Sequence, residues 1–202
     1  MSATVAVNGM GTIGKRVAAA VLKQDDMELA GIADVAPTAE LRTVIGEDGP
    51  LSDVDLYAST ADGAGELADA GFTVVGELAD ILDDEVDVVV DATPSGIDEQ
   101  NKENLYREHD VRAIFQGGAA DSIAPVKFNA NANYDEARGE QFVKVVSCNT
   151  TSLCRTLDAV DSEYGVDEVV ANLVRRGGDP KQDSRGPINS IVPVHEVPSH
   201  HG

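Results

Sequence analysis

The 202-residue sequence has no tryptophan, two cysteines and few basic residues. It contains no run of 18 apolar residues and opens on no signal peptide, which argues against a membrane-spanning helix and predicts a cytoplasmic protein. The two cysteines, Cys148 and Cys154, are therefore expected to be free thiols and not a disulfide framework. With 42% hydrophobic residues the chain is still long enough to bury a core.

Positive charge is scarce: 15 basic residues against 36 acidic ones give a formal net charge of -21. Such a surface repels nucleic-acid phosphates and anionic membranes, so neither is expected as a partner. The acidic residues are spread over the predicted helices and loops and do not form one terminal tail. An acidic surface that stays hydrated in concentrated salt fits a halophilic source, where salt screens the self-repulsion.

The strongest local motif follows the first predicted strand. Residues 3–8 form a short apolar segment and residues 15–22 have the pattern of a helix. Between them lies a G-x-G-x-x-G motif, made by Gly9, Gly11 and Gly14. In this setting the glycines permit a tight turn, close approach of a pyrophosphate and close packing of the helix. The N–H groups of Thr12 and Ile13 are expected to point at the anion.

An acidic residue stands where a ribose hydroxyl is expected. The second predicted strand, residues 28–33, ends at Asp34, twenty residues beyond Gly14. A carboxylate there accepts a hydrogen bond from the ribose 2′-hydroxyl and repels a 2′-phosphate, which favours NAD over NADP. The alternative is a structural glycine turn with a surface aspartate.

Helical and extended patterns alternate up to residue 146. We predict helices over residues 39–45, 61–70, 77–82 and 98–108, and strands over residues 55–59, 72–75, 86–90, 111–115 and 141–146. This order predicts an α/β fold with a Rossmann-type, doubly wound parallel sheet. Residues 93–96 are expected to border the nicotinamide ribose, with an ordinary turn as the alternative, and Gly118 is expected to let the backbone approach the cofactor. Residues 119–140 are predicted to be a loop.

A cysteine occupies the turn between the last of these strands and a further predicted helix. At a helix N-terminus a thiolate, which is the nucleophilic form, is stabilised. The N–H groups of Asn149 and Thr150 are expected to be free to face an oxyanion. Cys148 is thus the candidate nucleophile, with a buried structural cysteine as the alternative, and Cys154 is expected to pack inside the helix.

The remaining candidates lie between residue 166 and residue 202. Residues 166–174 are predicted to be a strand and are followed by Arg175 and Arg176, which suggest an anionic ligand, although salt bridges to the many carboxylates explain them equally well. His200 and His201 can donate to a phosphate or carbonyl oxygen. No Cys, His and Asp spacing completes a zinc or iron site, so no metal is expected.

Taken together, the motifs resemble those of archaeal-type (type II) phosphorylating glyceraldehyde-3-phosphate dehydrogenase. The matching segments are residues 7–17, 116–118, 146–151, 174–176 and 198–202. The resemblance implies that Cys148 attacks glyceraldehyde 3-phosphate and that inorganic phosphate releases the thioester as 1,3-bisphosphoglycerate, with NAD or NADP as cofactor. It assigns dinucleotide contacts to Thr12, Ile13, Gly118 and Arg176. It assigns substrate contacts to Ser147, Cys148, Asn149, His200 and His201.

The same resemblance implies the organisation of the chain. Residues 1–147 would form the NAD(P)-binding Rossmann domain and residues 148–202 the start of an α+β substrate domain. The family continues beyond this point, and its catalytic histidine is expected past residue 202, so the chain is predicted to be the N-terminal fragment of a homotetrameric enzyme. Family members often carry a basic residue where Asp34 stands and accept NADP. The alternatives are a semialdehyde or acyl-phosphate reductase, and a non-catalytic dinucleotide-binding fragment.

Overall fold

The computed structural model describes residues 2–83, 86–116 and 118–172. Its strands are β1 (Ala3–Asn8), β2 (Met27–Asp34), β3 (Leu56–Ala58), β4 (Gly76–Glu77), β5 (Val88–Asp91), β6 (Arg112–Phe115), β7 (Val126–Phe128) and β8 (Phe142–Val145). Its α-helices are α1 (Gly14–Val21), α2 (Ala39–Ile45), α3 (Ala61–Asp69), α4 (Leu78–Asp83), α5 (Ile97–Asn101) and α6 (Cys148–Tyr164). A π-helix, η1 (Lys102–Tyr106), continues α5, and two 3₁₀ turns, η2 (Asp121–Ile123) and η3 (Tyr134–Ala137), precede β8.

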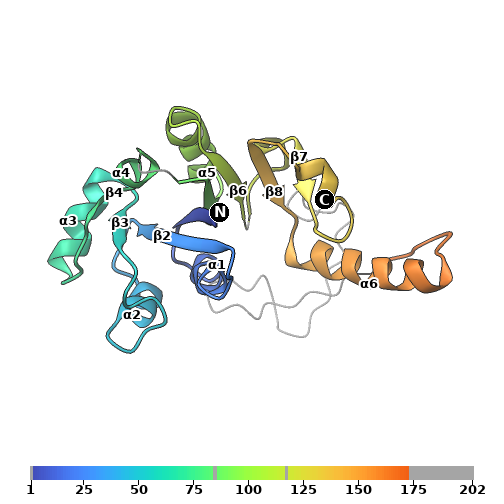
Figure 1. Cartoon of the computed structure of the whole chain (residues 1–202), viewed down its shortest axis with the longest axis horizontal. Coiled ribbons are helices and arrows are strands. Elements are labelled where there is room, and N and C mark those ends of the chain that lie inside the picture. The colour runs from blue at the N-terminus through green and yellow to red at the C-terminus, as the bar shows by residue number, and fades with distance from the viewer. Residues whose placement is uncertain (1, 84–85, 117, 173–202) are drawn as a thin grey trace, which may run out of the picture.

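The strands form one parallel sheet in the order β4-β3-β2-β1-β5-β6-β8-β7 (Figure 1). The predicted Rossmann-type sheet is therefore confirmed. The chain winds outward from β1 in one direction through β2 to β4 and in the other direction through β5 and β6, where β8 is inserted between β6 and the edge strand β7. Where a doubly wound sheet reverses in this way, a crevice opens outside the carboxyl ends of the strands, and it is the usual ligand position.

Both faces of the sheet are buried because neighbouring residues of a strand point to opposite sides. On β1, Val5 and Val7 pack with α1, α2 and α3 on one face, whereas Ala6 packs with α4 and η1 on the other. Figure 1 shows α1 and α2 below the sheet and α4 and α5 above it. This double burial accounts for the continuous apolar run that forms β5.

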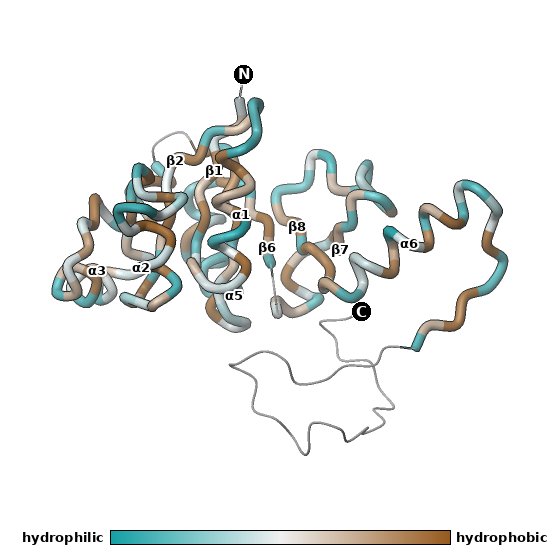
Figure 2. Tube along the Cα trace, turned by 90° about the horizontal axis from the view of Figure 1, so that it is seen from below, coloured by the Kyte–Doolittle hydropathy of each residue, from teal (hydrophilic) through white to brown (hydrophobic). Residues whose placement is uncertain are grey.

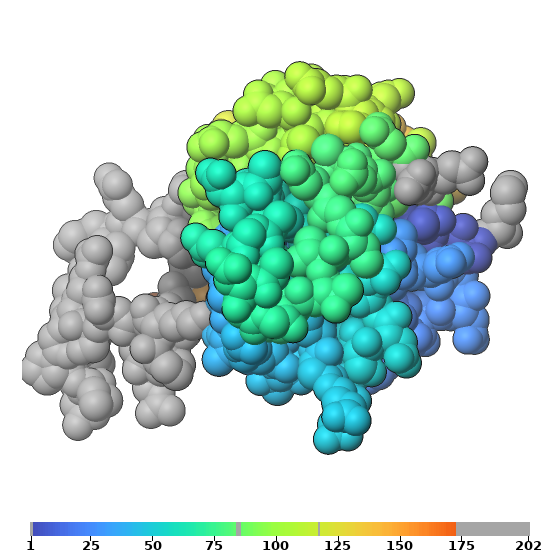
Figure 3. Space-filling model, turned by 90° about the vertical axis from the view of Figure 1, so that its left-hand side faces the viewer, coloured from blue at the N-terminus to red at the C-terminus, as the bar shows by residue number. Residues whose placement is uncertain are grey.

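The helices α2 and α3, on the β4 side of β1, begin at threonine caps. The Thr38 side chain accepts a hydrogen bond from the N–H of Leu41 at 3.1 Å, and Thr60 accepts one from the N–H of Gly63 at 3.2 Å. Such caps satisfy N–H groups that have no partner inside the helix. Figure 3 shows this end of the molecule covered by the teal and green residues of α3 and α4, which protect the edge strand β4.

Several predicted boundaries were wrong. The strand placed at residues 72–75 is the two-residue β4, Gly76–Glu77. The loop predicted over residues 119–140 contains β7, which pairs with β8. The helix predicted over residues 98–108 is divided into α5 and the π-helix η1. A three-residue strand and a π turn have no clear signature in hydrophobic periodicity, so pattern analysis could not find them.

Beyond β8 none of the described residues is fully buried. None of the α6 residues is buried, and the helix extends away from the sheet (Figure 1). Figure 2 shows hydrophobic and hydrophilic residues alternating along α6. The strand predicted for residues 166–174 is absent from residues 166–172, and residues 173 and 174 lie outside the described part. Within the described part, no helix is long and apolar enough to cross a membrane.

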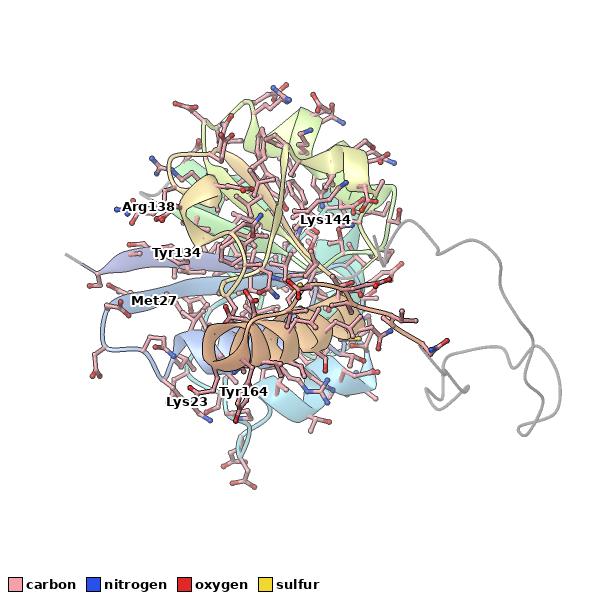
Figure 4. The ribbon with its side chains drawn as sticks, turned by 90° about the vertical axis from the view of Figure 1, so that its right-hand side faces the viewer. Lys23, Met27, Tyr134, Arg138, Lys144 and Tyr164 are labelled. Carbon is pink, nitrogen blue, oxygen red and sulfur yellow. The ribbon has the colours of Figure 1, made fainter. Side chains whose placement is uncertain are left out.

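An apolar pocket of about 440 Å³ lies where β2, β5 and β6 begin. Its lining includes Met27, Val88, Ile114, Phe128 and Tyr134. Figure 4 shows Met27, Tyr134 and Arg138 on the same side of the molecule. Because the glycine turn follows the opposite, carboxyl end of β1, this pocket is not the predicted cofactor crevice.

Candidate active site

The glycine turn after β1 has the geometry that its motif predicts. Gly9 has a φ of +91°, and a Cβ there would lie 3.0 Å from the backbone of Ala92. At Gly14 a Cβ would lie 1.8 Å from the carbonyl oxygen of Gly9, closer than any real contact. Side chains are thus excluded at both positions, at Gly9 by φ and at Gly14 by the approach of α1 to the turn.

The middle of the turn is open. A Cβ at Gly11 would meet no atom within 4 Å. Among the residues that the structure describes, none accepts a hydrogen bond from the N–H of Thr12 or Ile13. The helix α1 begins at Gly14 without a side-chain cap. Free N–H groups, a positive helix end and an uncovered glycine are features that fit a pyrophosphate.

Asp34, at the end of β2, is tied to the same turn. Its side chain is buried, and its Oδ2 accepts a hydrogen bond from the N–H of Met10 at 3.0 Å. The Oδ1 accepts a hydrogen bond from the N–H of Val35 at 2.7 Å. Each carboxylate oxygen can accept a further hydrogen bond, so Asp34 both shapes the turn and keeps acceptor capacity for a ribose hydroxyl.

The loop after β5 lies directly against the glycine turn. Asp91, the last residue of β5, is buried, and its Oδ1 accepts hydrogen bonds from the N–H of Thr93 at 2.8 Å and from the Thr93 hydroxyl at 2.5 Å. The backbone N of Thr93 lies 3.2 Å from the position of a Cβ on Gly9. The predicted nicotinamide loop, residues 93–96, is therefore held at its start by a buried carboxylate.

Cys148 is the first residue of α6 and is exposed as a free thiol. Ser147 caps the helix: its Oγ accepts a hydrogen bond from the N–H of Thr150 at 3.2 Å. The expectation that the Thr150 N–H is free for an oxyanion is therefore wrong, because the serine cap uses it. The N–H of Asn149 has no hydrogen-bond acceptor within the described part of the chain. Cys154 lies half-buried, six residues further along the same helix.

An ion pair with a buried lysine supports the strand that leads to the cysteine. Lys144 of β8 is 1% exposed and is paired with Asp121 of η2 (Figure 4 labels Lys144). A buried ammonium requires such a partner. The pair connects β8 to the segment that follows Gly118, and the alternating strand pattern gave no sign of it.

Parallel pairing brings most of the predicted site to one edge. Gly9 follows β1, Asp34 ends β2, and Gly118 follows β6. Cys148 is the third residue after the end of β8. Gly118 is exposed, and a Cβ there would meet no atom within 4 Å. The predicted ligand residues Arg176, His200 and His201 lie outside the described residues.

The sheet order and the glycine turn at its switch point define a dinucleotide-binding protein of the Rossmann class, to which α6 adds an exposed thiol. No protein-family model matches the chain. Over 98–100% of its length, however, the chain matches the N-terminal part of archaeal-type glyceraldehyde-3-phosphate dehydrogenases, which confirms the resemblance seen in the motifs. The chain spans 57–58% of the length of these relatives.

Three relatives illustrate the match. The chain is 50% identical over 200 residues to the glyceraldehyde-3-phosphate dehydrogenase of Methanothermobacter thermautotrophicus, covering 98% of this chain and 57% of the relative. For Thermococcus sibiricus the identity is 50% over 202 residues, covering 100% and 58%. For Halobacterium salinarum it is 49% over 199 residues, covering 98% and 57%, and this relative supports the expectation of a halophilic source.

Solved structures are more distant. Aspartate semialdehyde dehydrogenase with NADP from Candida albicans is 13% identical with a TM-score of 0.49, and the match covers 82% of this chain and 48% of that one. The putative oxidoreductase yvaA from Bacillus subtilis is 15% identical with a TM-score of 0.48, covering 81% and 40%. These similarities are too low to add to what the sheet order itself shows.

Proposed function

We propose that this chain is the cofactor-binding and nucleophile-bearing part of a phosphorylating glyceraldehyde-3-phosphate dehydrogenase. The observation that carries the proposal is the exposed Cys148 at the start of α6, on the same edge of the sheet as the glycine turn. Relatives of about 50% identity bear this enzyme's name, which supports the choice of substrate. The enzyme would work in the cytoplasm, in glycolysis or gluconeogenesis, as a homotetramer.

In the proposed reaction the Cys148 thiolate attacks the aldehyde carbon of glyceraldehyde 3-phosphate and forms a carbon–sulfur bond. A bound nicotinamide dinucleotide supplies the hydride acceptor that takes this carbon to the thioester level. Inorganic phosphate then attacks the thioester carbonyl and the carbon–sulfur bond breaks. The acyl phosphate, 1,3-bisphosphoglycerate, is released, and Cys148 returns to the thiolate form. The N–H of Asn149 is suited to bind the oxyanion, and Ser147 with Asn149 flanks the substrate. His200 and His201 are proposed to bind its phosphate.

The dinucleotide is proposed to cross the crevice with its pyrophosphate on the turn from Gly9 to Gly14. The open space at Gly11 and the free N–H groups of Thr12 and Ile13 support this assignment. Gly118 and Arg176 are proposed as further cofactor contacts.

NAD is the proposed cofactor because the buried Asp34 carboxylate would repel the 2′-phosphate of NADP. Replacing Asp34 with serine should lower the ratio of the NADPH dissociation constant to the NADH dissociation constant. Both constants are measured by the fluorescence of the reduced nicotinamide. An unchanged ratio would contradict the role of Asp34 in discrimination.

The decisive experiment compares Cys148→Ser with Cys154→Ser, two identical changes six residues apart in one helix. Acyl transfer from an activated ester is measured on this chain in high KCl. Dehydrogenase activity with glyceraldehyde 3-phosphate and phosphate is measured on the longest available product of the same gene, with semialdehydes tested alongside. Only Cys148→Ser should abolish acyl transfer while NADH still binds. Equal losses in both variants, or loss of NADH binding with Cys148→Ser, would mean that Cys148 is structural.

A further inference from the structure

A chain of buried polar groups runs beneath the crevice. The Ser59 hydroxyl lies 2.6 Å from Asn8 Oδ1, and Asn8 Nδ2 donates to the hydroxyl of Tyr106 at 3.1 Å. The Tyr106 hydroxyl in turn donates to Asp91 Oδ2 at 2.6 Å. Asn8 and Tyr106 are fully buried, and Asp91 is 1% exposed. The network thus joins the last residues of β1 and β5 directly below the glycine turn and the Thr93 loop.

Asp91 is the centre of this network. Its Oδ2 accepts hydrogen bonds from Tyr106 and from Asn101 Nδ2 at 2.9 Å, while its Oδ1 accepts both Thr93 donors. These four hydrogen bonds offset the loss of hydration of the buried carboxylate. Burial, followed by the charge of Asp91 and its hydrogen bond, raises the pKa of Tyr106 well above the usual value. The Tyr106 hydroxyl therefore keeps its proton and remains a donor.

The π-helix explains how two side chains reach the same oxygen. Asn101 and Tyr106 are five residues apart, which matches the i→i+5 hydrogen bonds of η1, such as the one from the Arg107 N–H to the Lys102 carbonyl at 3.1 Å. In a regular α-helix residues five apart point roughly 140° away from each other. The π-helix brings both side chains to the sheet side. Single π turns of this kind often occur at functional sites.

We propose that Tyr106 and Asn101 are positioning residues for the dinucleotide, acting through Asp91 and Thr93. By clamping Asp91 they fix the start of the 93–96 loop against Gly9, where the backbone of Ala92 already leaves no room for a Cβ. Their side chains bind Asp91, and no direct contact with the dinucleotide is proposed for either. The inference rests on the proposed function, because it requires that the crevice between the turn and this loop binds a dinucleotide.

The first test is the affinity of the full chain for NADH, measured by nicotinamide fluorescence in high KCl. Tyr106→Phe keeps the ring and removes the hydroxyl. We expect about a tenfold weaker affinity, as for the loss of one hydrogen bond to a charged group. Tyr164→Phe is the matched control, since Tyr164 is 82% exposed on α6, and its affinity should equal that of the wild type.

A double-mutant cycle separates positioning from loss of stability. Thr93→Val removes the hydroxyl at the other end of the proposed path. If Tyr106 acts through Thr93, the two losses of NADH affinity will not add, because the second substitution breaks a connection that the first has already released. Urea unfolding of each variant is measured in the same salt. A fall in unfolding midpoint with unchanged affinity, or fully additive losses of affinity, would show a merely structural role and overturn the proposal.

Asn101→Ala covers the case in which Tyr106→Phe does not fold. Asn101 is half-buried, and truncating it removes one of the four donors to Asp91. Weaker NADH binding by this folded variant supports the clamp, whereas wild-type affinity overturns it. If the wild-type chain binds neither NADH nor NADPH, the proposed function fails, and this inference fails with it. If the wild type binds and the variants bind equally well, only the inference fails.

Discussion

Replacing Gly14 with alanine tests the packing of α1 on the glycine turn. The added Cβ would lie 1.8 Å from the Gly9 carbonyl oxygen and 3.4 Å from the Cβ of Ala92. To reach an ordinary contact of roughly 3.5 Å, helix and turn must separate by more than about 1.5 Å. The clashing oxygen belongs to the backbone of Gly9. The N–H of Gly9 donates a hydrogen bond to the Ala33 carbonyl at 2.8 Å, so this part of the backbone is fixed and its oxygen cannot move aside as a side chain would.

The expected cost follows from this overlap. Overpacking of a well-filled interior costs about 1–3 kcal/mol, and a backbone clash of this size belongs at the upper end. For a slope of about 2 kcal/mol per molar urea, a loss of roughly 3 kcal/mol lowers the unfolding midpoint by about 1.5 M. Dinucleotide affinity should fall as well, because the separation moves the N–H groups of Thr12 and Ile13.

Gly65→Ala is the control. Gly65 lies exposed in α3, and a Cβ there would meet no atom within 4 Å. Alanine in an exposed helix position is worth about 0.5–1 kcal/mol over glycine, so this variant should be slightly more stable than the wild type. Both are measured by urea unfolding followed by circular dichroism at one KCl concentration. A Gly14→Ala variant as stable as Gly65→Ala would refute the close approach of α1 to Gly9.

Three further predictions concern charge. Burial raises the pKa of Asp98, whose Oδ2 is buried without a hydrogen-bond partner within the described residues. The contribution of Asp98 to the stability of the fold is therefore complete below its ordinary pKa of 3.8, and it is lost as pH rises through the raised pKa of the folded state. Asp98→Asn should therefore gain more stability over the wild type at pH 7 than at pH 4 in urea unfolding, and an equal gap at both pH values would count against this assignment. Asp121→Asn leaves the buried Lys144 ammonium unpaired and should lower the free energy of unfolding by roughly 3–5 kcal/mol. Lys144→Met leaves only a partly exposed carboxylate and should lower it by less, so the reverse order of thermal midpoints would contradict the burial of the lysine. Finally, the net charge of -21 predicts that the urea midpoint rises between low and multimolar KCl, and a flat or falling midpoint would argue against a salt-adapted surface.

The parts of the fold that depend on local signals could be predicted. The strand, glycine turn and helix around residues 3–22 and the cysteine at the start of α6 have compact signatures in neighbouring residues. Once the strands are parallel, their carboxyl ends must share an edge, which brings Asp34 to the Gly9 turn. Local patterning therefore sufficed for the Rossmann class and for the position of Cys148 at the start of a helix.

The parts that depend on distant contacts could not be predicted. Asn8 and Tyr106 are 98 residues apart in sequence, and their hydrogen bond requires a π turn that periodicity does not show. The role of Thr150 was missed for a different reason. Ser147 accepts its N–H as a helix cap, and a serine cap competes with an oxyanion site for the same donors. Residues of this kind are identified only when hydrogen-bond partners are known.

The position of β8 in the sheet has a consequence for how the molecule is made. The strand that leads to Cys148 lies between β6 and β7, both of which come earlier in the chain. During synthesis the sheet from β1 to β6, with the glycine turn, is available before β8 emerges from the ribosome. The nucleophile is therefore added after the strands that carry the glycine turn and Asp34. A chain stalled before residue 141 would carry the glycine turn and Asp34 but neither of the two thiols.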